Sequence, residues 1–250
     1  MNIISIVVII GIAILILFFS GCQKRDDETK PEPEPTPNPP IAITPERVEL
    51  VQRNGWHDSR VVRWGNYRYS AIDHTGHREW IENALCTWSQ VIGANTSFYL
   101  APEDSDAHGW ITFEFDKSIF DWRDANGRLV RAWGLCRILY RNHEIYSANI
   151  KILPPGNYSS KGYLEPFYGL FKHELGHAMG FRAHTTGNCV MNCNPGNTFV
   201  SQPVSDMLNV LYQLSPGDIF STIAPTRSLK EEVEDSKGEL VVVDPIDDWK

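Results

Sequence analysis

The 250 residues leave room for one domain of ordinary size once the two ends are set aside. The net charge at pH 7 is −8 and the sequence has no long cluster of lysine and arginine, which excludes an electrostatic surface for nucleic acid. Aromatic residues make up 11% of the chain, enough bulky apolar surface for a substantial hydrophobic core.

An uncharged apolar run over residues 3–19 opens the chain and is followed by Ser-Gly-Cys, ending at Cys22. Its length alone does not distinguish a signal peptide from a membrane anchor. The small residues before the cysteine resemble the processing site of a bacterial lipoprotein, in which the chain is cut before a cysteine that is then lipidated. We therefore expect a lipoprotein signal peptide over residues 1–21 and a membrane anchor at Cys22. An uncleaved N-terminal anchor is the alternative, because the run is preceded by no positively charged side chain.

A spacer and a tail flank the expected domain. Residues 31–40 alternate proline with polar residues, which is typical of polyproline II, and we assign residues 22–45 to the lipidated cysteine and this spacer. Residues 228–250 carry eight acidic residues against three lysines and predict a solvated acidic tail, although the VVVDP sequence within it could pair as a late strand. The domain itself is assigned to residues 46–227.

The domain sequence predicts the order strand, helix, four strands, helix, loop and helix. The predicted strands are rich in β-branched and aromatic residues and cover residues 60–72, 96–101, 109–115, 131–140 and 145–153. Apolar residues at offsets of three and four predict helices over residues 78–93, 164–179 and 204–214.

Four cysteines remain besides Cys22, and an even number in an exported domain suggests two disulfides. We favour Cys86 with Cys136 and Cys189 with Cys193, since the last two lie four residues apart and flank one tight loop. Four free thiols or a metal site are the alternatives. Cys-x3-Cys without a second close pair is poor spacing for zinc.

The stretch HELGHAMGFRAH over residues 173–184 carries the chemistry. Residues four apart on a helix project from one face, so His173 and His177 can bind one metal ion together. Imidazole nitrogen is a good zinc ligand, and a catalytic zinc needs three protein ligands with the fourth position left for water. The Glu174 carboxylate, beside the metal, can take a proton from that water and deliver it to a leaving amine. An ordinary amphipathic helix with exposed histidines is the alternative for the pentad alone.

These residues resemble the metzincin metallopeptidases, whose motif is HExxHxxGxxH with a downstream Met-turn, and within them the matrixin type. The resemblance covers about residues 56–215; it is strong at HELGHAMG and at CVMN, which contains Met191, and elsewhere only the order of elements agrees. It implies an α+β fold with a twisted five-stranded mixed sheet, an active-site helix, a Met-turn and a C-terminal helix. It also implies that substrate lies as an extended strand along the edge strand, here around residues 132–137.

The third histidine departs from the family motif. The motif position is occupied by Ala183, which cannot bind zinc, and His184 follows one residue later. The spacing from His173 to Met191 still equals the matrixin spacing, so a bulge in the loop after Gly180 can bring His184 to the ion. We therefore assign His173, His177 and His184 as zinc ligands. Water or another side chain, such as Asp206 or His143, and a degraded site are the alternatives.

A second metal site is a weaker hypothesis. Glu103, Asp104 and Asp106 offer oxygen ligands for a structural calcium ion, but a solvated loop is the favoured interpretation. The remaining histidines lack ligand spacing and are interpreted as surface or loop residues.

The sequence therefore predicts a zinc-dependent endopeptidase that hydrolyses extracellular proteins or peptides. Its catalytic residue is Glu174, and it is expected to be a monomer without a nucleic-acid partner. The lipid anchor at Cys22 would tether it at the outer membrane or cell surface. The first alternative is a surface lipoprotein that binds peptide or another ligand on the same scaffold and has lost efficient hydrolysis through the shifted third ligand. A purely structural cell-surface protein is a more distant alternative.

Overall fold

The computed structural model describes residues 41–56, 59–93, 95–101, 109–123, 127, 129–130, 132–154, 167–186, 188–192, 199–220 and 237–245. The chain divides into two compact units, residues 1–36 and 37–250, and all the described residues belong to the second. The predicted signal peptide, Cys22 and the proline-rich stretch lie outside the described residues. None of the helices described is long and apolar enough to cross a membrane.

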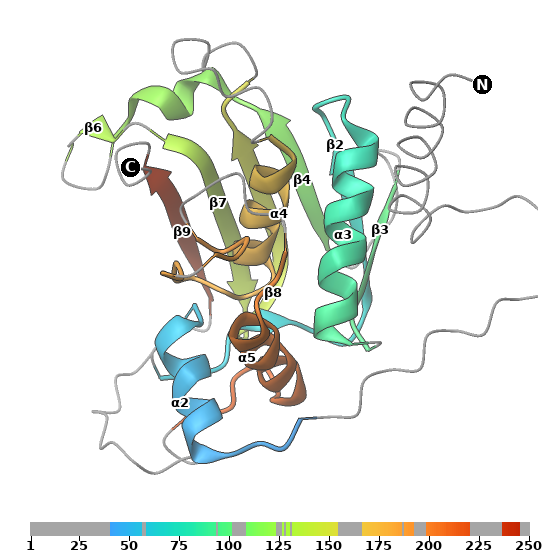
Figure 1. Ribbon diagram of the computed structural model, residues 1–250, viewed down its shortest axis with the longest axis vertical. Helices are drawn as coiled ribbons and strands as arrows, with labels where there is room; N and C mark the ends of the chain where they lie inside the picture. The colour runs from blue at the N-terminus through green and yellow to red at the C-terminus, as the bar shows by residue number, and fades with distance from the viewer. Residues whose placement is uncertain are drawn as a thin grey trace, which may run out of the picture. The chain divides into compact units, whose positions relative to one another are not determined.

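A mixed seven-stranded sheet forms the centre of the second unit (Figure 1). Six strands follow one another in the order β3-β2-β4-β8-β7-β9, and β1 pairs with β8. The strands are β1 (Arg63–Trp64), β2 (Arg68–Asp73), β3 (Ser97–Leu100), β4 (Trp110–Phe115), β7 (Ala132–Arg141), β8 (Glu144–Ile152) and β9 (Lys237–Pro245). The pairs among β1, β2, β3, β4 and β8 are parallel, whereas β7 runs antiparallel to both β8 and β9.

The described residues form four α-helices besides the sheet: α2 (Pro45–Asn54), α3 (Arg78–Ile92), α4 (Phe167–Ala178) and α5 (Gln202–Gln213). Figure 1 shows α3 and α4 side by side in front of the sheet, and α4 packs against β7 and β8. The short 3-10 helix η1 (Lys117–Asp121) precedes a separate two-stranded ribbon made of β5 (Trp122–Arg123) and β6 (Leu129–Val130). Fully buried aromatic side chains, among them Trp64, Trp88 and Phe171, fill the core between helices and sheet.

The α+β class and three predicted helices are confirmed, but the expected five-stranded sheet is wrong. The predicted strand over residues 60–72 is split into β1 and β2. In addition, residues 237–245 form β9 instead of a solvated tail. The alternative that the VVVDP sequence pairs as a late strand is therefore confirmed. Helix α2, whose Thr44 side chain caps the Arg47 N–H, was not predicted, because this short helix buries only Val48 and Val51 and has little apolar periodicity.

Both predicted disulfide pairs are wrong. Cys136 and Cys189 are free, buried thiols. Cys136 lies in the middle of β7, and burial raises its pKa well above the ordinary value, with the charges of Glu174 and Asp244 adding to the effect. Cys86 is disulfide-bonded, and its partner lies outside the described residues. Spacing along the sequence could not reveal that the strand pairing of Cys136 turns its side chain into the core.

An ion pair links the ends of β4 and β8. Lys151 Nζ donates to Asp116 Oδ2 at 2.7 Å and lies 3.3 Å from Glu114 Oε1. Partial burial would raise the pKa of Asp116, but the hydrogen bonds from Lys151 and from the Ser118 N–H outweigh burial and lower it to about 2. The carboxylate form is therefore stabilised in the folded chain.

We expect Asp116→Asn to reduce the free energy of unfolding at pH 7 by about 1 kcal/mol, allowing for solvent screening of this partly exposed pair. Because the folded pKa lies below the unfolded value, the stabilisation is present above about pH 4 and is lost as the pH falls towards about 2. Urea denaturation of both chains at pH 7, 4 and 3 measures it. A difference between the two chains that stays constant with pH would contradict the assignment.

Candidate metal centre

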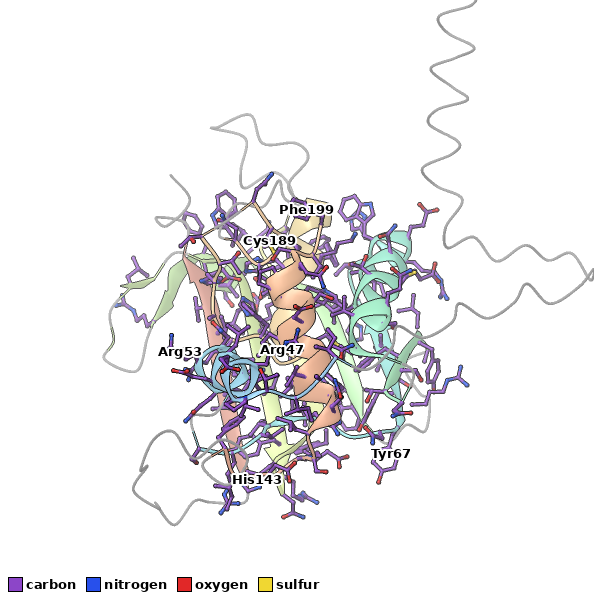
Figure 2. The ribbon with its side chains drawn as sticks, turned by 60° about the horizontal axis from the view of Figure 1, so that its bottom comes forward. Arg47, Arg53, Tyr67, His143, Cys189 and Phe199 are labelled. Carbon is purple, nitrogen blue, oxygen red and sulfur yellow. The ribbon has the colours of Figure 1, made fainter. Side chains whose placement is uncertain are left out.

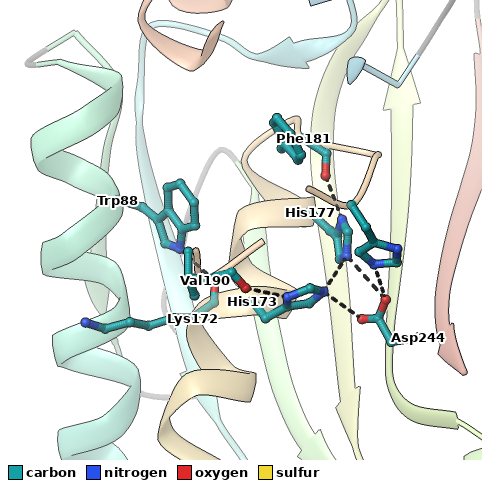
Figure 3. A network of polar contacts seen from close by, with 8 residues as sticks. Trp88, Lys172, His173, His177, Phe181, Val190 and Asp244 are labelled. Carbon is teal, nitrogen blue, oxygen red and sulfur yellow. Dashed lines mark hydrogen bonds and ion pairs between the residues drawn. The ribbon is translucent and has the colours of Figure 1, made fainter. Parts of the chain in front are cut away.

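His173 and His177 lie one turn apart on the buried face of α4, and their hydrogen bonds set the direction of both rings (Figure 3). His173 Nδ1 donates to the Val190 carbonyl at 2.6 Å, and His177 Nδ1 donates to the Phe181 carbonyl at 2.6 Å. A carbonyl oxygen can only accept, so the proton of each neutral ring is on Nδ1 and the lone pair is on Nε2. The two Nε2 atoms lie 3.1 Å apart.

The end of α4 is fixed by side chains from three other parts of the fold. Gly180 adopts a φ of +120°, a conformation that favours glycine, and the Phe181 N–H then donates back to the Gly176 carbonyl at 3.1 Å. Three aromatic side chains donate to the last carbonyl groups: Trp56 to His177 (2.9 Å), Trp64 to Ala178 (2.8 Å) and Tyr212 to Met179 (3.0 Å). The carbonyl groups at the helix end that carries His177 therefore have protein donors and need no water molecules as hydrogen-bond partners.

The loop after Gly180 brings His184 to the two helical histidines. The His184 ring centre lies 5.2 Å from the ring centres of both His173 and His177. The next residue, Thr185, donates its N–H to the Met191 carbonyl at 2.8 Å and so closes the loop. Ala183, which occupies the family position of the third ligand, packs instead against the hydrophobic core. The extra residue before His184 is thus absorbed within the loop.

A fourth side chain, Asp244 of β9, completes the group and was not predicted. Its Oδ1 lies 2.5 Å from His184 Nε2 and 3.6 Å from His177 Nε2, while its Oδ2 lies 3.2 Å from His173 Nε2. Asp244 is 1% exposed and is paired across the strands with Gly134 of β7. The only signal in the sequence was an acidic residue directly after three valines, in a segment whose partner strand lies about a hundred residues earlier.

These four residues form a candidate metal site. One ligand atom from each of His173, His177, His184 and Asp244 lies within 4.8 Å of the others. A tetrahedral ion with bonds of about 2.0–2.1 Å needs ligand atoms about 3.3 Å apart, close to most of the separations here. The donor set also fits a cation, because the lone pairs of two buried Nε2 atoms face each other beside a carboxylate.

Burial and the Asp244 carboxylate shift the pKa values of the two helical histidines in opposite directions. Burial lowers the pKa of His177, which keeps its imidazole neutral. Burial also disfavours charge on His173, but the adjacent Asp244 carboxylate outweighs it and raises that pKa. Burial alone would raise the pKa of Asp244, but interactions with the neighbouring His173, Glu174 and His177 side chains outweigh burial and hold that pKa well below its ordinary value.

Glu174 lies beside the group and is completely buried. Burial raises its pKa well above the ordinary value, and the negative charge of Asp244 raises it further. Neither Glu174 oxygen has a hydrogen-bond donor among the residues that the structure describes. A Cβ atom added at Gly134 would overlap Glu174 Oε1, so the glycine at this position of β7 leaves space for the Glu174 carboxyl group.

Met191 packs directly beneath the site helix. A Cβ atom added at Gly176, the glycine of HELGH, would overlap the Met191 sulfur and lie 2.6 Å from the Trp88 ring. Met191 is fully buried, and its neighbour Val190 supplies the carbonyl that orients His173. The glycine therefore allows the close approach through which this turn supports the metal site.

The structure does not bring the other candidate ligands to this group. Asp206 accepts a hydrogen bond from Gln202 on α5, and His143 lies at the turn between β7 and β8 (Figure 2). His74 and His77 are likewise outside the metal group. Several residues considered in the sequence analysis lie outside the described part of the chain: His57, His108, Cys193 and the proposed calcium ligands Glu103, Asp104 and Asp106.

Comparison with protein-family models finds no match for this chain, and comparison with curated proteins finds no relative. A functional assignment therefore rests on the geometry of the metal group and on the residues around it.

We expect His184→Ala to weaken zinc binding about 100-fold or more, because removal of a direct ligand costs at least as much as removal of a supporting hydrogen bond. Competition with a chromogenic chelator measures the affinity of the full-length chain. His74→Ala is the control, since His74 lies outside the group. Equal affinities for His184→Ala and the unchanged chain would mean that the shifted histidine is no ligand.

Proposed function

We propose that this protein is a zinc-dependent endopeptidase that hydrolyses extracellular proteins or peptides and is tethered at the cell surface through Cys22. The observation that carries the proposal is the convergence of three imidazole nitrogens on one point with the Glu174 carboxylate beside them. The resemblance of HELGHAMG and CVMN to the metzincins, and the packing of Met191 under the site helix, support it further.

Zinc fits the donor set better than a hard cation does, because three of the four groups offer imidazole nitrogen atoms. His173, His177 and His184 would hold the ion. Zinc supplies two functions in such sites: it lowers the pKa of a water molecule to about 7, and it polarises a carbonyl group. The carbonyls of Val190 and Phe181 keep the two helical imidazoles in the orientation that binds the ion.

Glu174 would act as the general base and then as the general acid. Its carboxylate takes one proton from the water that attacks the scissile carbonyl and delivers it to the amine nitrogen as the C–N bond breaks. The products are a carboxylic acid and an amine, and Glu174 returns to its starting protonation state. The apolar surroundings exclude bulk water from this exchange.

The substrate would be an extended peptide paired with the edge of β7. The chain's own β9 supports this assignment, since it pairs with β7 along that edge in the antiparallel direction. Backbone hydrogen bonds to an edge strand provide affinity without selecting side chains, which suits an endopeptidase with varied protein substrates. The Gly134 position lies next to Glu174, so the scissile bond would lie near this residue.

A second function has one observation in its favour. Asp244 gives the site four protein ligands, as in structural zinc sites, so the chain could bind peptide or simply bind zinc without hydrolysis. Glu174 argues for catalysis, because a structural site gains nothing from a buried carboxylate that has no hydrogen-bond donor and costs free energy to desolvate.

We expect Glu174→Gln to reduce cleavage of unfolded casein about 1,000-fold, the usual contribution of a general base, while zinc content stays at one ion per chain. The assay uses the full-length chain in two forms, unchanged and with Asp244→Ala, because Asp244 would be a fourth protein ligand and would leave no coordination position for the reacting water. Glu82→Gln, which alters an exposed ion pair on α3, is the matched control. Casein cleavage that survives Glu174→Gln excludes the mechanism, and no cleavage by any form favours the binding protein.

Gly134→Ala should separate metal binding from catalysis. Because the new methyl group overlaps Glu174 Oε1, the carboxylate has to move, and displacements near 1 Å cost about 100-fold in rate. We expect zinc content to remain unchanged while the rate constant for cleavage by the Asp244→Ala chain falls by that amount. Steady-state kinetics together with metal analysis test it. A normal rate constant would show that Glu174 is not constrained by β7.

A further inference from the structure

We propose that the C-terminal strand keeps this enzyme latent: β9 occupies the peptide-binding edge of β7, and Asp244 fills the coordination position that the reacting water needs. This inference rests on the proposed function, because it concerns the regulation of the same site. Four features of the described chain support it.

The first feature is that β9 covers β7 from end to end. Their register runs from Ala132 opposite Pro245 to Arg141 opposite Lys237, and the other edge of β7 is paired with β8. Both edges of β7 are therefore taken, and no strand can be added beside it while β9 remains. An extended substrate and β9 must compete for one set of backbone hydrogen bonds.

The second feature is the position of the Asp244 carboxylate. Its two oxygens reach all three histidines, at 2.5 Å from His184, 3.2 Å from His173 and 3.6 Å from His177. A catalytic zinc site keeps one position open, whereas four protein ligands close it. In this arrangement the metal would be bound firmly, but no water could be activated beside Glu174.

The third feature is an irregularity that aims Asp244 at the metal position. The register of β7 and β9 shifts between Ala132 and Gly134, where Asp244 is paired. Such irregularities bend a strand and redirect a side chain. Gly134 has no side chain on the face shared with Asp244, so the Asp244 and Glu174 carboxyl groups both fit there. The register shift and the glycine at position 134 therefore both allow the Asp244 carboxylate to lie at the metal group.

The fourth feature is that β9 is held by contacts that a substrate could replace. Backbone pairing supplies most of them, and Val242 is the buried apolar side chain of the strand. The ion pair between Arg137 and Glu239, at 2.8 Å, is half exposed and contributes little. Because β9 belongs to the same chain, its effective concentration at β7 is on the order of mM, so a free peptide competes poorly.

The test compares the unchanged full-length chain with Asp244→Ala, with Asp244→Asn, and with Asp206→Ala as a control acid outside the metal group. Each chain is loaded with Co²⁺ in place of zinc and titrated with acetohydroxamate, a small chelating ligand, while the visible absorption band of the metal is followed. We expect the two Asp244 variants to bind acetohydroxamate about 100-fold more tightly than the unchanged chain and Asp206→Ala. Equal binding by all four chains overturns the proposal.

The outcomes separate the two proposals. If the Asp244 variants bind acetohydroxamate but no chain cleaves any peptide, the endopeptidase assignment fails and the closed metal site stands. If the unchanged chain cleaves casein as fast as Asp244→Ala, the endopeptidase stands and latency fails.

Discussion

The site depends on two hydrogen bonds, from His173 Nδ1 to the Val190 carbonyl and from His177 Nδ1 to the Phe181 carbonyl. They put both Nε2 lone pairs at one point and would hold them there through metal loading and release. Both acceptors belong to the loop that follows α4, so the rings are correctly aimed only when this loop is correctly folded. The close packing of Met191 on Gly176 and the aromatic donors at the helix end serve that one requirement.

The same requirement explains how a one-residue shift of the third histidine is tolerated. The loop is anchored at Gly180, where the helix ends, and at Met191, whose carbonyl accepts the Thr185 N–H. Because both ends of the loop are fixed, one additional residue before His184 can be compensated by one residue fewer between His184 and Met191, and neither end has to move. Ala183 packs against the core and His184 joins the candidate metal site, so three imidazoles still converge although their spacing differs from the family motif.

Local patterns in the sequence predicted most helices and strands, together with His173, Glu174 and His177, because each depends on residues a few positions apart. Features that depend on pairing between distant parts of the chain could not be predicted in this way. Asp244 joins the site only because β9 pairs with a strand about a hundred residues away, and Gly134 matters only through its contact with Glu174. The free thiol of Cys136 was not predicted for the same reason, since only the strand pairing places this residue in the centre of the sheet.

The pairing of β9 with β7 also answers a constraint that has nothing to do with catalysis. An enzyme that binds substrate by β-augmentation must expose a long strand edge, and an exposed edge promotes aggregation. Here β7 is ten residues long and largely buried on its faces, so it would be a strong template for other chains. Pairing with a strand of the same chain removes that hazard, and in the proposed endopeptidase it would also block the substrate. In the proposed endopeptidase, protection of the β7 edge and latency would both follow from this one strand pairing. Because a free peptide competes poorly with β9, whatever releases the metal site must also supply a new partner for the β7 edge.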